Sequence, residues 1–165
     1  MCETGCLDCQ PLVDTAPEID GFKIELVSCN LLTPTTRKFI YEITPVGSPP
    51  RDISNILVCL CPDAYVENSC ELTVTDSAQP TCEFETNPNA EGNPVKCQGI
   101  KFEGLGDNKE TGDMITISFV VDDQLVTVKP IEIGYKAATF DFIWEVCGPS
   151  CNIQPVKKRK RGIKF

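Results

Sequence analysis

The chain carries eleven cysteines in 165 residues, and three of them, Cys2, Cys6 and Cys9, lie at its very start. Cysteine thiolates bind metals, act as nucleophiles or form disulfides, so these residues define the chemistry open to the chain. Because eleven is odd, pairing within one chain leaves a thiol over, and in an oxidising setting such a thiol indicates a bond between chains. We therefore predict that Cys2, Cys6 and Cys9 form disulfides with neighbouring chains.

An iron-sulfur interpretation of the same three cysteines competes with this prediction. Their Cys-x3-Cys-x2-Cys spacing formally matches the one that holds a [4Fe-4S] cluster in radical-SAM enzymes. Those enzymes also need repeated strand-helix units around the substrate, and the chain has neither the helices nor the length. We therefore favour an extended connector that carries cross-linking thiols.

The cysteines in the middle of the chain allow a zinc site or disulfides. Cys59, Cys61, Cys70 and Cys82 offer four thiolates, but they lack the paired C-x2-C sequences of zinc ribbons. In a strand, Cys59 and Cys61 would point to the same face. We therefore expect no metal and no cofactor, and we predict disulfides within the chain for five cysteines, namely Cys59, Cys61, Cys70, Cys82 and Cys97.

Cys147 and Cys151 follow the last predicted strand and are separated by Gly148-Pro149-Ser150. The Gly-Pro pair indicates a tight turn that would let the two thiols meet. The spacing also permits a redox-active pair, although no thioredoxin-like strand-helix context surrounds it.

The chain has no histidine, which removes several classes of enzyme and metal site. Ser-His-Asp and Cys-His hydrolases, HExxH zinc proteases and Cys/His zinc fingers all require one. No spaced pair of carboxylates suggests general acid and base catalysis either. We therefore predict that the protein is not an enzyme and has no catalytic residues.

Charge is distributed unevenly along the chain. The net charge is -9, yet six of the fifteen Lys and Arg residues lie beyond residue 156, in a stretch without acidic residues. The preceding residues then carry nine basic against 24 acidic groups, which makes nucleic acid an unsuitable partner. The basic tail, with its run Lys157, Lys158, Arg159, Lys160 and Arg161, can instead contact acidic copies of the same protein in a salt-sensitive way.

Short alternating segments predict an all-β fold. Phe22, Ile24 and Leu26 alternate with Lys23 and Glu25, and Phe39, Tyr41 and Ile43 alternate with Ile40, Glu42 and Thr44. Similar strand patterns recur up to residue 146 with turn-forming residues between them. No helical pattern of ten residues or more is visible. We predict an antiparallel β-sandwich or jelly roll of eight or nine strands, with three parts: a connector over 1–20, a body over 21–152 and a basic tail over 153–165.

Local patterns near the end of the body give more specific predictions. Asp122-Asp123 suggests a tight hairpin that pairs residues 115–121 with residues 125–129, and Pro130 then interrupts the strand pattern. Phe140, Phe142 and Trp144 share one face of the following strand, where we expect them to pack in the core.

The body also shows a family resemblance. It is carried by Phe39-Ile40-Tyr41-Glu42-Ile43-Thr44, by residues 48–54 (SPPRDIS), by Gly99-Ile100-Lys101-Phe102 and by the terminal residues 147–151 (CGPSC). These pieces, behind a cysteine-bearing connector, resemble surface proteins of spore-forming Firmicutes, and in particular endospore appendage subunits. The resemblance implies a jelly roll whose connector thiols bond to neighbouring subunits. It implies Cys29 and either Cys147 or Cys151 as the acceptors on the body.

The sequence thus favours a structural subunit of a spore coat, exosporium or appendage fibre that assembles with copies of itself and with other spore-surface proteins. No stretch is long and apolar enough to insert in a membrane, and no secretory signal is recognisable, which fits surface proteins released with the spore. The alternative is a binding or adhesion module that presents loops, such as residues 77–96, to a carbohydrate or protein ligand.

Overall fold

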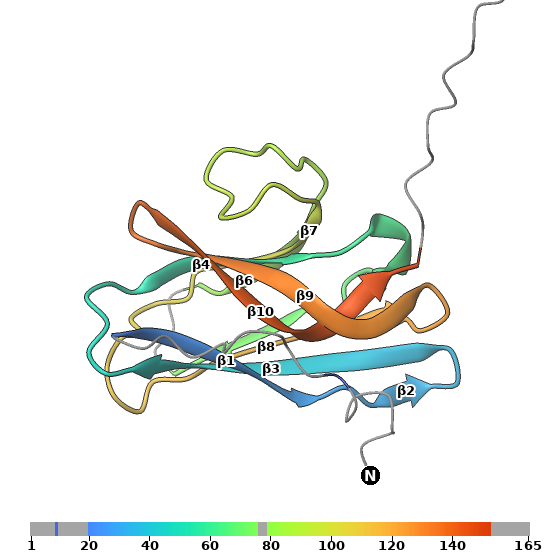
Figure 1. The fold of residues 1–165 in the computed structure, drawn as a ribbon, viewed down its shortest axis with the longest axis horizontal. Helices are drawn as coiled ribbons and strands as arrows, with labels where there is room; N and C mark the ends of the chain where they lie inside the picture. The colour runs from blue at the N-terminus through green and yellow to red at the C-terminus, as the bar shows by residue number, and fades with distance from the viewer. Residues whose placement is uncertain (1–8, 10–19, 76–78, 153–165) are drawn as a thin grey trace, which may run out of the picture.

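The computed structural model describes residue 9, residues 20–75 and residues 79–152. Ten strands form two five-stranded antiparallel sheets that pack face to face (Figure 1). The predicted all-β sandwich is therefore confirmed, with ten strands instead of eight or nine. The predicted tail and most of the predicted connector lie outside the described residues.

The first sheet is built around the long central strands β3 and β8. Its strands follow the order β1 (Gly21–Ser28), β3 (Thr36–Val46), β8 (Ile115–Asp122) and β5 (Glu71–Val74), and the short β2 (Leu31–Thr33) pairs with β3 beyond the end of β1. Every second residue of β3 is buried from Arg37 to Ile43. The alternation that predicted this strand therefore also marks its core-facing side.

The second sheet ends in two unlike edge strands. Its order is β10 (Phe140–Cys151), β9 (Val126–Ala137), β4 (Ile53–Cys59), β7 (Gly99–Glu103) and β6 (Thr81–Glu85). A short 3-10 helix, η1 (Pro62–Ala64), follows β4. Strands β2 and β6, which are only three and five residues long, were not predicted, and β6 lies inside the segment predicted as a binding loop.

The predicted hairpin at Asp122-Asp123 is wrong. Strand β8 pairs with β3 and β5 in the first sheet, whereas β9 pairs with β10 and β4 in the second. Leu125 N–H donates to Asp122 O at 3.2 Å, and Asp123 N–H donates to Thr35 O at 2.9 Å. These bonds hold a turn that carries the chain from one sheet to the other, so a tight turn between two strands does not by itself pair them.

Pro130 does not interrupt a strand but lies within β9. It faces Cys147 of β10, and β4 pairs with β9 only from residue 133 onward. Pro130 therefore lies in a part of β9 that pairs on one side only, and strands tolerate a proline best where the ladder is incomplete.

The two sheets enclose one hydrophobic core. Phe39, Tyr41, Ile56, Phe102 and Phe119 are fully buried in it. Tyr41 of β3 donates its hydroxyl to the carbonyl of Cys147 on β10 at 2.8 Å, which joins the first sheet to an edge of the second. Burial raises the pKa of the Tyr41 hydroxyl far above its ordinary value, so it stays a neutral donor. In the described parts of the chain, no helix is long and apolar enough to cross a membrane.

Candidate functional site

Strand β10 is the longest edge strand of the molecule that the structure describes. It pairs with β9 along its whole length, from Phe140 opposite Ala137 to Cys151 opposite Val126. Among the described residues, no strand pairs with its other side. An edge strand presents unpaired N–H and C=O groups to which another segment can bind, so β10 is a candidate binding site for another segment.

A disulfide fixes the predicted connector to this edge. Cys9 bonds to Cys147 with a Cα–Cα distance of 5.8 Å, across 138 residues of sequence. Cys147 is only 5% exposed. The bond thus anchors a residue from the start of the chain in a buried position on β10.

A second disulfide holds the end of the same strand. Cys151 bonds to Cys61, just before η1, with a Cα–Cα distance of 6.2 Å. The prediction that Cys147 and Cys151 meet across a turn is wrong, because residues 148–150 continue β10 without a turn. Four residues of strand span roughly 13 Å, which exceeds the reach of a disulfide.

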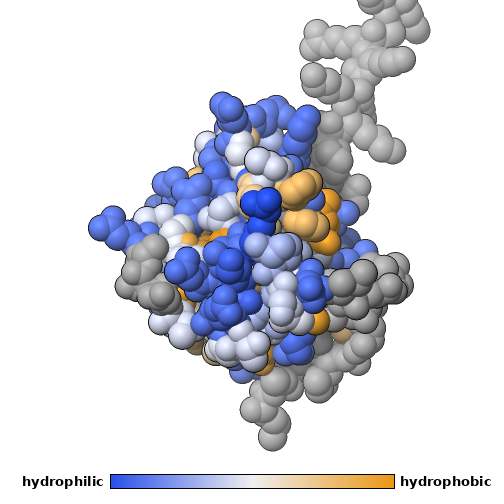
Figure 2. All heavy atoms as spheres, turned by 90° about the vertical axis from the view of Figure 1, so that its left-hand side faces the viewer, coloured by the Kyte–Doolittle hydropathy of each residue, from blue (hydrophilic) through white to orange (hydrophobic). Residues whose placement is uncertain are grey.

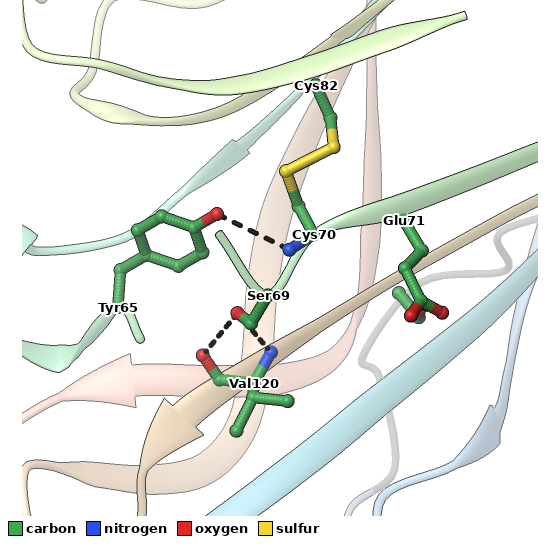
Figure 3. The surroundings of a disulfide bond; sticks show 7 residues. Tyr65, Ser69, Cys70, Glu71, Cys82 and Val120 are labelled. Atoms are coloured by element: carbon green, nitrogen blue, oxygen red, sulfur yellow. Dashed lines mark hydrogen bonds between the residues drawn. A yellow bond between two sulfur atoms is a disulfide. The ribbon is translucent and has the colours of Figure 1, made fainter. Parts of the chain in front are cut away.

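Two further disulfides lie away from β10. Cys59 bonds to Cys97, and Cys70 bonds to Cys82 beside Tyr65 and Ser69 (Figure 3). Cys59 and Cys61 thus have different partners, in spite of the shared face that we predicted. All five cysteines predicted to bond within the chain do so here. The zinc alternative fails for its four cysteines, because a sulfur in a disulfide is not a thiolate ligand.

The structure differs from the sequence prediction for the cysteines assigned to bonds between chains. Cys9, Cys147 and Cys151 all bond within the chain. The physical reason is that the start of the chain reaches its own edge strand and that Cys61 lies beside the end of β10. Cys29 is buried and also disulfide-bonded, and its partner lies outside the described residues, as do Cys2 and Cys6. The basic run 157–161 also lies outside them.

The two lateral sides of the sandwich are therefore closed in different ways. On one side, Cys70 and Cys82 join the neighbouring edges β5 and β6. On the other side, β10 faces β1, and the indole N–H of Trp144 donates to Phe22 O at 2.9 Å. The Cys9–Cys147 bond belongs to this second side.

An apolar groove of about 190 Å³ opens at the start of β10. Its lining combines the aromatic rings of Phe22, Tyr135, Phe140 and Phe142 with residues 49–51 of the β3–β4 turn. Figure 2 looks onto this end of the molecule and shows a patch of hydrophobic side chains among mostly hydrophilic ones. The groove therefore offers aromatic faces to a ligand or to another protein surface.

The prediction that Phe140, Phe142 and Trp144 are all core residues holds only for Trp144. Trp144 is 4% exposed, whereas Phe142 is 44% and Phe140 is 59% exposed. Trp144 lies opposite β1, and the two phenylalanines precede it toward the β9–β10 turn. The alternating aromatic residues Phe140 and Phe142 are the sequence signal for this groove, whereas Pro49 and Pro50 join them only in the fold.

Tyr135 connects the groove to the core. Its ring stacks on Phe142 with centroids 4.9 Å apart and on Trp144 with centroids 4.1 Å apart. Burial raises the pKa of the Tyr135 hydroxyl to about 12. It is therefore neutral at physiological pH and takes part in packing or hydrogen bonding, not in proton transfer.

Within the described ranges, no group of three or more Cys, Asp or Glu side chains is placed to hold a metal ion. Comparison of the chain with models of known protein families and with curated proteins finds no match. The candidate site thus rests on its own geometry: an edge strand with two disulfides over its second half and an exposed aromatic groove at its start.

Proposed function

We propose that the protein is a structural subunit of a spore surface, such as a spore coat, an exosporium or an appendage fibre, and that disulfides join it to copies of itself. The observation that carries this proposal is the bond between Cys9 and Cys147. It attaches the start of the chain covalently to a long edge strand. A subunit that assembles through an extended terminal segment needs both features.

The same bond can form between two copies. Asp20 lies eleven residues beyond Cys9, and an extended chain of that length spans at most about 40 Å. That reach allows Cys9 to meet Cys147 of its own chain or of an adjacent one. Exchange of identical segments between copies keeps every contact of the acceptor site and therefore costs little.

Two properties of the whole chain support assembly. Eleven cysteines cannot all pair inside one chain, so a thiol is left for a bond to another molecule. The acidic body and the basic run beyond residue 156 also attract each other between copies, most strongly at low salt.

The disulfide content is compatible with an extracellular or surface protein, because disulfides persist in oxidising surroundings. The proposed partners are copies of the chain and other spore-surface proteins, without nucleic acid or membrane insertion. The proposed role needs no catalysis and no cofactor.

Electron microscopy of the purified protein, with and without a reductant, tests this function. We expect fibres or layers that the reductant dissolves, together with a ladder of oligomers on non-reducing gels. The variant Cys9→Ser should give shorter ladders. Monomers that are identical with and without reductant would overturn the proposal.

The aromatic groove favours one alternative function, a module that binds a carbohydrate. Exposed Phe140 and Phe142 offer flat apolar faces, and Arg51 supplies a polar group at the rim. Glycan-array binding by the wild type that is lost in Phe142→Ala would support it. Leu32→Ala, which removes an exposed hydrophobic side chain elsewhere, is the matched control.

A further inference from the structure

We propose that the Cys61–Cys151 disulfide is a thiol-disulfide exchange site that accepts the left-over thiol of a second copy of this chain. The choice of a second copy as the source of the thiol rests on the proposed assembly function. The reactivity of the disulfide itself does not, because it follows from the surroundings of its two sulfurs.

The disulfide lies at an open hollow of the body. This hollow, about 500 Å³, is lined by Cys61 and Cys151, by the second disulfide, Cys59–Cys97, and by parts of β9 and β10. Both Cys61 and Cys151 are half-buried. An incoming thiolate can therefore approach their bond, which is the first requirement for exchange.

A backbone N–H favours one direction of attack. The N–H of Cys61 donates to Sγ of Cys151 at 3.0 Å. When the bond breaks toward Cys151, this donor stabilises the negative charge that develops on the departing sulfur. A leaving thiolate that is stabilised in this way departs faster.

The exchange needs no external oxidant. The incoming thiolate attacks Sγ of Cys61 and forms a new sulfur-sulfur bond to it. The Cys61–Cys151 bond breaks, its electron pair goes to Cys151, and Cys151 becomes the thiolate. One disulfide and one thiolate thus yield one disulfide and one thiolate.

The left-over thiol comes from the start of the chain. All nine described cysteines are disulfide-bonded, so the odd thiol among eleven belongs to Cys2 or Cys6. Exchange at Cys61 would convert this thiol into a covalent link between copies and would pass the free thiol on to Cys151.

Two other bridges provide internal comparisons. Cys147 is 5% exposed, so the Cys9–Cys147 bond is less accessible at that sulfur. Cys70 and Cys82 line another open hollow and are also half-buried. However, the N–H of Cys70 donates to the Tyr65 hydroxyl (Figure 3), and among the described residues no hydrogen bond reaches either of these two sulfurs. Cys70–Cys82 is therefore a matched bridge without the stabilising donor.

The experiment uses the full chain, reduced glutathione as the thiol probe, and exclusion of oxygen. After a short reaction the sample is quenched with acid, new thiols are alkylated, and peptides are mapped by mass spectrometry. We expect glutathione on Cys61 and the alkyl group on Cys151, at a rate several-fold above that of opening Cys70–Cys82. Glutathione mainly on Cys151, equal rates for the two bridges, or no reaction at Cys61 would each overturn the exchange site.

A second arm tests the source of the thiol. Copies with and without ¹⁵N are assembled together, and disulfide-linked peptides that contain Cys61 are sequenced. We expect Cys61 of one isotope joined to Cys2 or Cys6 of the other. Disulfides between copies that never include Cys61 would overturn this inference and leave the assembly function intact. A complete absence of disulfides between copies would contradict the assembly function, whatever the glutathione arm shows.

Discussion

Each lateral side of the sandwich carries a disulfide, but the two disulfides join residues at very different separations in the sequence. Cys70–Cys82 joins β5 to β6 across only 12 residues of sequence. Cys9–Cys147 attaches the start of the chain to β10 across 138 residues. Because Cys70 and Cys82 are close in sequence, the two cysteines of this disulfide stay near each other in the same chain. The Cys147 position can instead accept Cys9 of its own chain or of another copy, and this difference is the basis of the proposed assembly.

The largest effect is expected from Cys9→Ser. Loss of this bridge frees the start of the chain, so covalent oligomers should shorten on non-reducing gels. The chain-entropy description of disulfides gives at most about 5 kcal/mol of stability for so long a loop. Denaturation of the variant should therefore show a lower free energy of unfolding as well. Unchanged oligomers would show that Cys9 does not form the disulfides between copies.

The double variant Cys70→Ser, Cys82→Ser removes the disulfide on the other lateral side of the sandwich. The loop between these residues is short, and its loss should cost about 3 kcal/mol in the free energy of unfolding. Covalent oligomers should persist at temperatures where the variant stays folded. Loss of the oligomers in this variant would contradict the claim that only the side with Cys9 and Cys147 joins copies.

A smaller effect is expected from Gly148→Ala, which tests how firmly β10 is held against the core. A Cβ added at Gly148 would meet the Tyr41 hydroxyl and Cδ1 of Ile131 well inside contact distance. Overpacking of this kind costs about 2 kcal/mol, measured by chemical denaturation. An unchanged midpoint of denaturation would show that β10 can move away from β3 without loss.

The variant Tyr41→Phe removes the hydroxyl that bonds to the carbonyl of Cys147. The buried carbonyl then lacks that donor, and we expect a loss of about 1 kcal/mol in the free energy of unfolding. Tyr65→Phe is the control, because its hydroxyl accepts only a long bond of 3.4 Å in a half-buried position. A larger loss for Tyr65→Phe would contradict the importance of the link between β3 and β10.

The smallest effect is expected from Phe140→Ser at the exposed start of β10. Phe140 is 59% exposed, so the free energy of unfolding should change by less than about 0.5 kcal/mol. The same variant should still form covalent oligomers if they depend on the second half of the strand. A large loss of stability would show that Phe140 belongs to the core after all.

Strand alternation predicted the interior well. The pattern at Phe39, Tyr41 and Ile43 predicted both the strand and its buried face, because a period of two leaves one face for the core. The same signal could not tell which strands become neighbours. Asp122 and Asp123 have the residue types of a hairpin turn, and only the pairing of strands distant in sequence, β8 with β3 and β9 with β4, shows that the chain changes sheets there.

The candidate site was predictable in its residue types but not in its pairs. The odd number of cysteines and the terminal position of Cys9 predicted that it forms a disulfide. Its bond to Cys147 could not be predicted, because it depends on where the edge of the sheet lies. Similarly, Phe140 and Trp144 share a face and have the same period, and only the position of β1 decides that one is exposed and the other buried. Asn108 is a further case: asparagine is typical of exposed turns, yet the buried side chain of Asn108 bonds to both the N–H and the carbonyl of Ile53.

The most direct test of the central claim is isotopic mixing of the assembled wild-type protein. Chains with and without ¹⁵N are unfolded under reducing conditions, combined, and allowed to assemble during reoxidation. Peptides that contain the Cys9–Cys147 bond are then weighed by mass spectrometry. We expect hybrid peptides, with Cys9 of one isotope bonded to Cys147 of the other. Assemblies in which Cys9 and Cys147 always carry the same isotope would contradict it.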